Sequence, residues 1–434
     1  MFGDPFINCV ILCSLFLLLN IKQIGLKGKS IVLPSTIFAF MWGWTSLGIV
    51  ILKLLNKTSL DSLPSSLIFI GNYEFNILLV CFASFLTARF ATKKYRFISI
   101  TSLSNNIEIP YLVKRLRWIL YLFCFLGIIR LGIVISSTGF NMSAMRAHYL
   151  STRAGFGVLD TNLIRITQYV LQFAIFYVCL LGLNASIYGL NLKQTIKDFI
   201  IFMPYQFSFG GRLYILSFFI PFFISYLGLH FTKPKSFIHN KTEIRKIGYL
   251  IGVALMLIVV MQIFKTGRTS NEPDVATGGE LFYSTTSYVR MYSLLEELPE
   301  ENKLKLGYGR NISPWFTTPS KEYTTILKGW EDSSNPALVC VPSMIPDMYL
   351  DFGKTGSYFL YFIIFFLIEY IAIKSMRKYS FRNFVTYVLL CIFTFNTVTS
   401  SMSDNFKSLF VGLIFLFLFT KLYLHRIKYA NIQS

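Results

Sequence analysis

The chain has 434 residues, of which 54% are hydrophobic and only 14% are charged. Soluble domains carry roughly 25% charged residues, so this composition excludes an ordinary soluble protein and indicates a polytopic membrane protein. The formal charge of +20 does not indicate a nucleic-acid partner, because the lysines and arginines lie in short clusters between apolar runs, as determinants of membrane orientation do.

Apolar runs long enough to cross a bilayer recur along the whole chain. A spanning helix needs about 20 such residues, and this criterion predicts an all-α fold of about 11 transmembrane helices. The sixth run is short and contains Pro204, so a kinked or re-entrant helix is expected there. The predicted spans are 6–21, 33–52, 67–88, 116–136, 163–189, 198–209, 212–231, 246–264, 355–373, 383–401 and 406–424.

Basic residues predict which side of the membrane each connection faces. Most of the 41 lysines and arginines lie in every second connection, and one large cluster runs from Arg89 to Arg117. Because cytoplasmic connections carry the excess of Lys and Arg, this pattern predicts an outward N-terminus and a cytoplasmic C-terminus. The basic residues at 89–117 are then expected to form a solvated cytoplasmic face without chemistry.

One long polar segment interrupts the apolar pattern. Residues 265–354 are punctuated by prolines and glycines and fall on the outer side of the membrane, which in a bacterium is the periplasm. A smaller outer loop is predicted at 137–162. The chain therefore divides into eight spans with short loops at 1–264, the long loop, and three spans with the C-terminus at 355–434. A chain that only conducts a solute rarely needs such an insert, so the long loop predicts half of an active site.

Arginines beside glycines on the outer side indicate a phosphate-binding site. An arginine in apolar surroundings costs a few kcal/mol, and its planar guanidinium matches a phosphate with two hydrogen bonds. Adjacent glycines allow close backbone approach. Each arginine could instead pair with a carboxylate or reach the lipid headgroups. The candidate pyrophosphate-binding residues are Arg130, Arg146, Arg153, Arg212, Arg268 and Arg290, with Gly210, Gly211 and Gly267 for backbone approach.

Carboxylates of the long loop are the candidate catalytic bases, because a hydroxyl nucleophile benefits from a nearby proton acceptor. Glu280 follows two glycines, and Asp347 and Asp351 precede the return to the membrane. Asp347 and Asp351 are four residues apart and would share one face of a helix. Any one of these carboxylates could instead face solvent, cap a helix or form a salt bridge. His148 is the one outward-facing histidine and a further candidate.

No metal or cofactor site is predicted. Six of the seven cysteines lie in apolar runs, where a thiol behaves as a small hydrophobe. The sequence contains no Cys-x-x-Cys pair, and its predicted outer loops contain no Asp-x-Asp motif. Structural zinc and metal-dependent catalysis are therefore not expected.

The arrangement of these motifs resembles the Wzy-type oligosaccharide repeat-unit polymerases of bacterial surface-polysaccharide pathways. The resemblance covers essentially the whole chain and rests on FGGR at 209–212, TGR at 266–268, and YLDFG at 349–353 followed by Gly356. These polymerases resemble the O-antigen ligases, which share a GT-C-like membrane fold and tend to carry a histidine near the end of the long loop. This sequence has no histidine there, which favours a polymerase over a ligase.

The resemblance implies a glycosyltransferase of the bacterial inner membrane that makes O-antigen or capsule. It would transfer the growing glycan from undecaprenyl pyrophosphate to a hydroxyl of a lipid-linked repeat unit. Arg212, Arg268 and Arg290 would hold the pyrophosphates, and Glu280 or Asp347 would deprotonate the acceptor. The implied partners are undecaprenyl-pyrophosphate-linked oligosaccharides and the bilayer, with a chain-length regulator and a flippase as further candidates and no nucleic acid.

The resemblance also assigns Arg130, Arg146 and Arg153 to the second lipid carrier. Other functions remain open on the sequence. A polysaccharide flippase would bury charged residues within its spans and show repeat symmetry and short loops. An O-antigen ligase-type transferase or an acyltransferase would use a catalytic histidine, and no histidine precedes His148.

Overall fold

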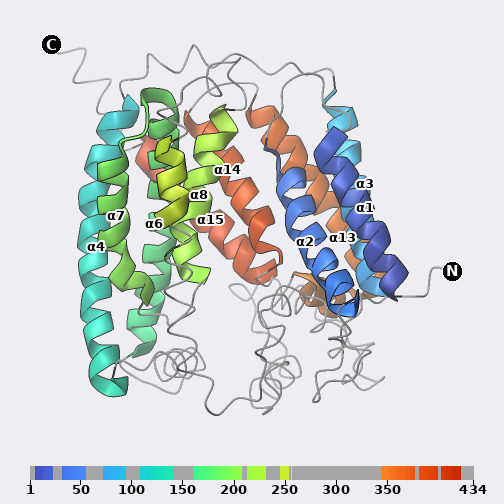
Figure 1. The fold of residues 1–434 in the computed structure, drawn as a ribbon, viewed down its shortest axis with the longest axis horizontal. Helices are drawn as coiled ribbons and strands as arrows, with labels where there is room; N and C mark the ends of the chain where they lie inside the picture. The colour runs from blue at the N-terminus through green and yellow to red at the C-terminus, as the bar shows by residue number, and fades with distance from the viewer. Residues whose placement is uncertain are drawn as a thin grey trace.

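Every regular element that the structure describes is a helix. The computed structural model describes residues 5–22, 32–54, 72–93, 108–139, 160–207, 213–230, 245–253, 256, 344–376, 381–398 and 402–421, and these ranges contain no strand (Figure 1). The helices are α1 (Pro5–Lys22), α2 (Pro34–Leu54), α3 (Asn72–Ala91), α4 (Glu108–Thr138), α6 (Asp160–Tyr188), α7 (Leu192–Phe207), α8 (Leu213–His230), α13 (Ile345–Ser375), α14 (Phe381–Asn396) and α15 (Met402–Phe419).

Ten of the predicted spans correspond to these ten helices, and residues 245–253, at the start of the remaining predicted span, are also helical. Two helices extend well beyond the apolar runs that predicted them. α4 begins at Glu108, before its predicted span, and α13 begins at Ile345, inside the stretch assigned to the long loop. Polar residues near the start of each helix explain why hydropathy alone placed these boundaries too late.

Among the described residues, three helices are long and apolar enough to cross a membrane, namely Tyr73–Ala91, Ile109–Thr138 and Asp351–Ser375. Shorter apolar helices at Ile7–Leu18, Phe173–Tyr188, Phe218–Leu227 and Asn405–Phe419 accompany them. Helices of this length and composition indicate a membrane-embedded protein.

The helices form one bundle in which successive helices run in alternating directions (Figure 1). α1, α2, α3 and α13 occupy one flank, and α4, α6, α7 and α8 occupy the other. We call the end at which α3 and α13 begin and α4, α7 and α14 end the loop-side end, because the chain enters α13 there from the long predicted loop. The other end is called the opposite end.

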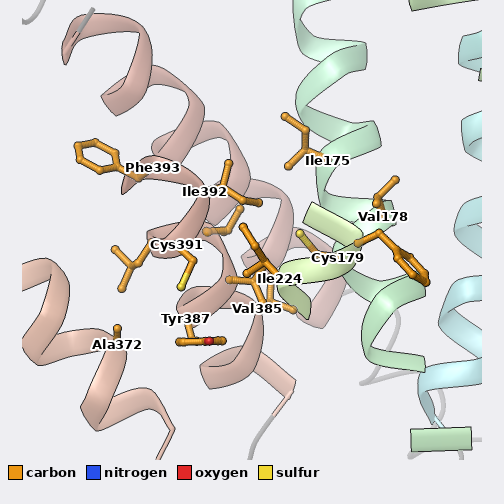
Figure 2. Packing of buried hydrophobic residues seen from close by; sticks show 14 of the residues in the cluster. Ile175, Val178, Cys179, Ile224, Ala372, Val385, Tyr387, Cys391, Ile392 and Phe393 are labelled. Carbon is orange, nitrogen blue, oxygen red and sulfur yellow. The ribbon is translucent and has the colours of Figure 1, made fainter. Parts of the chain in front are cut away.

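α14 lies at the centre of the core. It contacts α2 and α13 on one flank and α6 and α8 on the other. Figure 2 shows Cys391 and Ile392 of α14 among buried side chains of α6 and α8, which include Cys179 and Ile224. All the cysteines among the described residues are free thiols in apolar surroundings, as the sequence predicted. This central helix holds the two flanks at fixed positions.

Candidate functional site

The first two turns of α13 are bent away from the rest of that helix. Gly353 has φ 67° and ψ −173°, so residues 345–352 and 354–375 form two helical segments joined at a break. A positive φ favours glycine, because a Cβ at this position would crowd the backbone. Gly356 completes the bend, since a Cβ there would lie 2.8 Å from Cβ of Phe352. The YLDFG motif and Gly356 therefore encode this break.

The short segment before the break is fixed to the loop-side end of the core. The Met344 N–H donates to the carbonyl oxygen of Thr397, which follows α14, at 3.0 Å. The Met344 carbonyl accepts from the hydroxyl of Tyr361 at 2.6 Å. The hydroxyl of Thr397 in turn accepts from Trp42 Nε1 of α2 at 3.1 Å. The start of α13 is thus positioned by α2, by α14 and by its own second segment.

Three tyrosines gather beside the break, and we call Tyr73, Tyr349 and Tyr358 the tyrosine cluster. The ring centroid of Tyr73 lies 4.9 Å from that of Tyr349, edge to face, and 5.5 Å from that of Tyr358, stacked. The Tyr73 hydroxyl is 2.6 Å from Oγ of Ser357. Because Tyr73 belongs to α3 and the others to α13, the cluster joins the starts of these two helices.

Two predicted catalytic carboxylates lie on the short segment. Asp351 lies two residues before the break, its side chain is fully buried, and it is not without an interaction partner. The backbone of Asp347 is helical, which confirms that the two positions are one helical turn apart on a common face. The Asp347 side chain lies outside the described residues. Of the candidate bases, Asp351 is therefore the one whose buried side chain the structure describes, on the same short segment as Tyr349 of the tyrosine cluster.

Arg130 lies on the other flank of the bundle. It is fully buried on α4, three residues beyond Gly127, where a Cβ would meet the Cβ of Tyr205 on α7 at 2.6 Å. Residues three apart share a helix face, so Arg130 lies on the side of α4 that faces α7. It is about 4.5 Å closer to the loop-side end than Gly127, near the level at which α7 ends at Phe207. Figure 1 places α4 and α13 on opposite flanks, so Arg130 and Asp351 do not share one site.

The remaining predicted site residues lie outside the described residues. They are Glu280, Arg146, Arg153, Arg212, Arg268, Arg290, Gly210, Gly211 and Gly267, together with His148.

Sequence reasoning missed buried polar residues within three of the predicted spans. Glu74 of α3, Asp198 of α7 and Glu369 of α13 are each at most 2% exposed. The signal was present, since a lone carboxylate in an apolar run is costly and usually has a structural or functional role. Glu74 follows Tyr73 and therefore lies beside the tyrosine cluster.

The basic stretch at 89–117 is not uniformly solvated, which corrects the expectation from the sequence. Arg89 is fully buried, and its Nε lies 3.0 Å from Oε1 of Glu369. Arg117 is partly buried, and its Nε lies 3.2 Å from Oδ2 of Asp198. Helices α3 and α4 continue through these positions and direct both side chains into the bundle, where each meets a carboxylate that hydropathy did not single out.

No group of three or more metal-ligating side chains occurs among the described residues. The arrangement at the loop-side end instead combines a buried carboxylate with aromatic rings and hydroxyls, groups that can bind and deprotonate a polyhydroxylated ligand. Comparison of the chain with protein-family models, with curated proteins and with solved structures finds no match.

Proposed function

We propose that the chain is a lipid-linked oligosaccharide polymerase of the bacterial inner membrane, making O-antigen or capsule. The observation that supports this most is the broken start of α13, which carries the buried Asp351 and Tyr349 of the tyrosine cluster on one short segment at the loop-side end. Tyrosine rings pack on the apolar faces of sugars, while carboxylates and phenolic hydroxyls bond their hydroxyl groups. This is the chemistry that a glycan-transferring site requires.

In the proposed reaction, Asp351 accepts the proton from a hydroxyl of the incoming lipid-linked repeat unit. The hydroxyl oxygen forms a bond to the anomeric carbon of the growing glycan as the bond from that carbon to pyrophosphate breaks. Undecaprenyl pyrophosphate leaves with the electron pair, and Arg212, Arg268 and Arg290 stabilise its charge. Arg130, on the other flank, would hold the second lipid carrier.

The proposal includes eleven spans in a GT-C-like arrangement, with the N-terminus and the 265–354 loop in the periplasm. The alternating directions of the helices support this topology (Figure 1). So does the charge of the helix ends, because the opposite end collects lysines and arginines, as a cytoplasmic face does. Those at the ends of α3 and α13 and at the starts of α7 and α14 include Arg89, Lys374, Lys193 and Arg382.

The test uses purified protein with one defined lipid-pyrophosphate oligosaccharide and no nucleotide sugar. Products are resolved by size, and a ladder spaced by one repeat unit is expected. Asp351→Asn should reduce the rate of chain growth by at least about 100-fold, in the range attributed to a general base, and Arg212→Lys should impair it because a point charge lacks the guanidinium fork. A wild-type protein that leaves the substrate unchanged would overturn the proposal.

A flippase is the second candidate, favoured by one observation. Transport predicts charged residues buried within spans, and Arg89 with Glu369 is such a pair. Both groups are matched by local partners, however, which suits a structural role. Transfer of labelled lipid-linked sugar across vesicles containing the protein, without a product ladder, would establish the flippase instead.

A further inference from the structure

Glu74 is a buried carboxylate for which the described residues supply no hydrogen-bond donor from another residue. It lies in the first turn of α3 and is 2% exposed. Its carboxylate approaches its own backbone N–H, one of the donors that a helix start leaves free. No lysine or arginine among the described residues forms an ion pair with it, whereas Glu369 and Asp198 each have an arginine. Burying a carboxylate without such a partner is costly.

The Tyr358 hydroxyl is a second unfilled group in the same place. Its oxygen is buried and lies near the Asn76 side chain, but it forms no hydrogen bond of normal geometry within the described residues. Glu74 directly follows Tyr73 in α3 and lies within electrostatic range of the hydroxyls of Tyr73 and Tyr358. A buried acceptor and a buried hydroxyl therefore lie together beside the stacked rings of Tyr73 and Tyr358.

Tyr73 itself is not available to a ligand in the same way. Ser357 Oγ donates to the carbonyl oxygen of Lys354 at 2.7 Å, which uses its single proton. The Tyr73 hydroxyl must therefore donate to Ser357, and its proton is occupied in joining α3 to α13. Among the described residues of this region, Glu74 and Tyr358 are therefore the two groups left with hydrogen-bonding capacity for a ligand.

We infer that Glu74 and Tyr358 form a sugar-hydroxyl subsite, in which the carboxylate accepts a hydrogen bond from one hydroxyl and the phenol bonds a second. This rests on the proposed function and deepens it, because it assigns recognition of the acceptor sugar to the start of α3. The groups match a sugar in kind, since a carbohydrate offers several hydroxyl donors around an apolar ring face. Glu74 is here a binding and positioning residue, and Asp351 remains the base.

The test measures binding and turnover separately. The probe is lipid-linked oligosaccharide extracted from source cells that lack this protein, together with the same oligosaccharide released from its lipid by mild acid. Glu74→Gln and Tyr358→Phe should each weaken binding of the released oligosaccharide by roughly tenfold, as expected for one lost hydrogen bond. In the ladder assay, KM for the acceptor should rise by a similar factor while kcat changes less than threefold.

Tyr249→Phe is the matched control, because Tyr249 is exposed and belongs to a different helical segment. It should bind and turn over as wild type. Normal binding by both Glu74→Gln and Tyr358→Phe would overturn the subsite, even if wild type makes polymer. A fall in kcat alone would also overturn it, since that would assign the groups to the chemical step. If wild type binds the oligosaccharide and the variants do not, yet no ladder forms, the subsite stands and the polymerase proposal fails.

Discussion

The two ends of the α3–α13 pair bury carboxylates equally well but satisfy them differently. At the opposite end, Glu369 accepts from Arg89 Nε at 3.0 Å and from the Ser35 N–H at 3.0 Å, and the Ser35 hydroxyl also bonds both residues. At the loop-side end, Glu74 has no cationic partner among the described residues. Burial alone therefore does not distinguish a ligand-binding carboxylate from a structural one in this protein. A buried carboxylate that lacks protein donors, as Glu74 does among the described residues, is the better candidate for binding a ligand.

A second closed network makes the same point on the other flank. Asp198 accepts hydrogen bonds from Tyr177 at 2.6 Å, Tyr121 at 2.7 Å, Gln194 at 2.8 Å and Arg117 at 3.2 Å. These four donors come from α4, α6 and α7, so the carboxylate joins three helices. A group with four protein donors has no need of a ligand, and its role is to hold this flank together.

The largest expected effect comes from breaking the Arg89 network. Arg89→Met would leave Glu369 buried beside Ser35 with no cation, and it should lower the free energy of unfolding by about 3–5 kcal/mol. Arg89→Met with Glu369→Leu should recover most of that loss, because the uncompensated charge disappears. The measurement is the thermal unfolding of detergent-solubilised protein, followed by fluorescence-detected gel filtration.

Arg382→Met is the control for the Arg89 series, since Arg382 is an exposed arginine near the same end of the bundle. It should unfold as wild type does. If Arg89→Met also unfolds as wild type while the protein remains correctly inserted, the closed network is not structural, and the contrast between the two ends disappears.

Asp198→Asn should have the next largest effect, on the order of 2–3 kcal/mol of unfolding free energy. The amide keeps one acceptor oxygen, but its NH₂ group faces donors. The loss is smaller than for Arg89 because the Arg117 side chain is 21% exposed and water can solvate it. Tyr121→Phe, which removes one donor only, should cost about 1 kcal/mol by the same measurement. If Asp198→Asn and Tyr121→Phe lowered the unfolding free energy equally, Asp198 would not be acting as the acceptor for all four donors.

The sequence predicted the helices well because apolar runs of membrane length are a local signal. It placed the start of α13 too late because Pro346, Asp347 and Lys354 lower the local hydropathy. It named Asp351 and the glycines around the break, but it could not identify their neighbours. Contacts such as Tyr73 with Ser357 or Arg89 with Glu369 join residues about 280 positions apart, and nothing in the local sequence specifies them. The sequence named Arg130 as a pyrophosphate-binding candidate in the outer part of its span, but it could not show that Arg130 lies on the side of α4 that packs against α7 at Gly127, because that is a contact between helices.

Gly353→Ala tests whether the break in α13 is required for the arrangement of groups at the loop-side end. The positive φ of Gly353 should make alanine cost about 1–2 kcal/mol of unfolding free energy. Any relaxation toward a continuous helix would also move Asp351 relative to Tyr73 and Tyr358. The rate of polymer formation should therefore fall by more than the loss of folded protein alone explains. Gly132→Ala is the control, because a Cβ there meets nothing within 4 Å and should leave stability unchanged or slightly higher.

The smallest expected effects come from removing either partner of the hydrogen bond between Tyr73 of α3 and Ser357 of α13. Because Ser357 uses its proton on Lys354, Tyr73 is the donor in the 2.6 Å hydrogen bond. Ser357→Ala leaves a buried Tyr73 donor with no acceptor and should cost about 1–1.5 kcal/mol, whereas Tyr73→Phe leaves Ser357 with its Lys354 bond and should cost about 0.5 kcal/mol.

The double variant sharpens this last prediction. With both groups removed, no donor is left unsatisfied, so Tyr73→Phe combined with Ser357→Ala should cost less than the two single variants together. Additive costs would mean that the hydroxyls are not coupled, and the joint would then rest on ring packing alone. In that case the Tyr73 hydroxyl, like Glu74 and Tyr358, would be able to form a hydrogen bond to a ligand. The loop-side end would then contrast still more strongly with the satisfied network around Glu369.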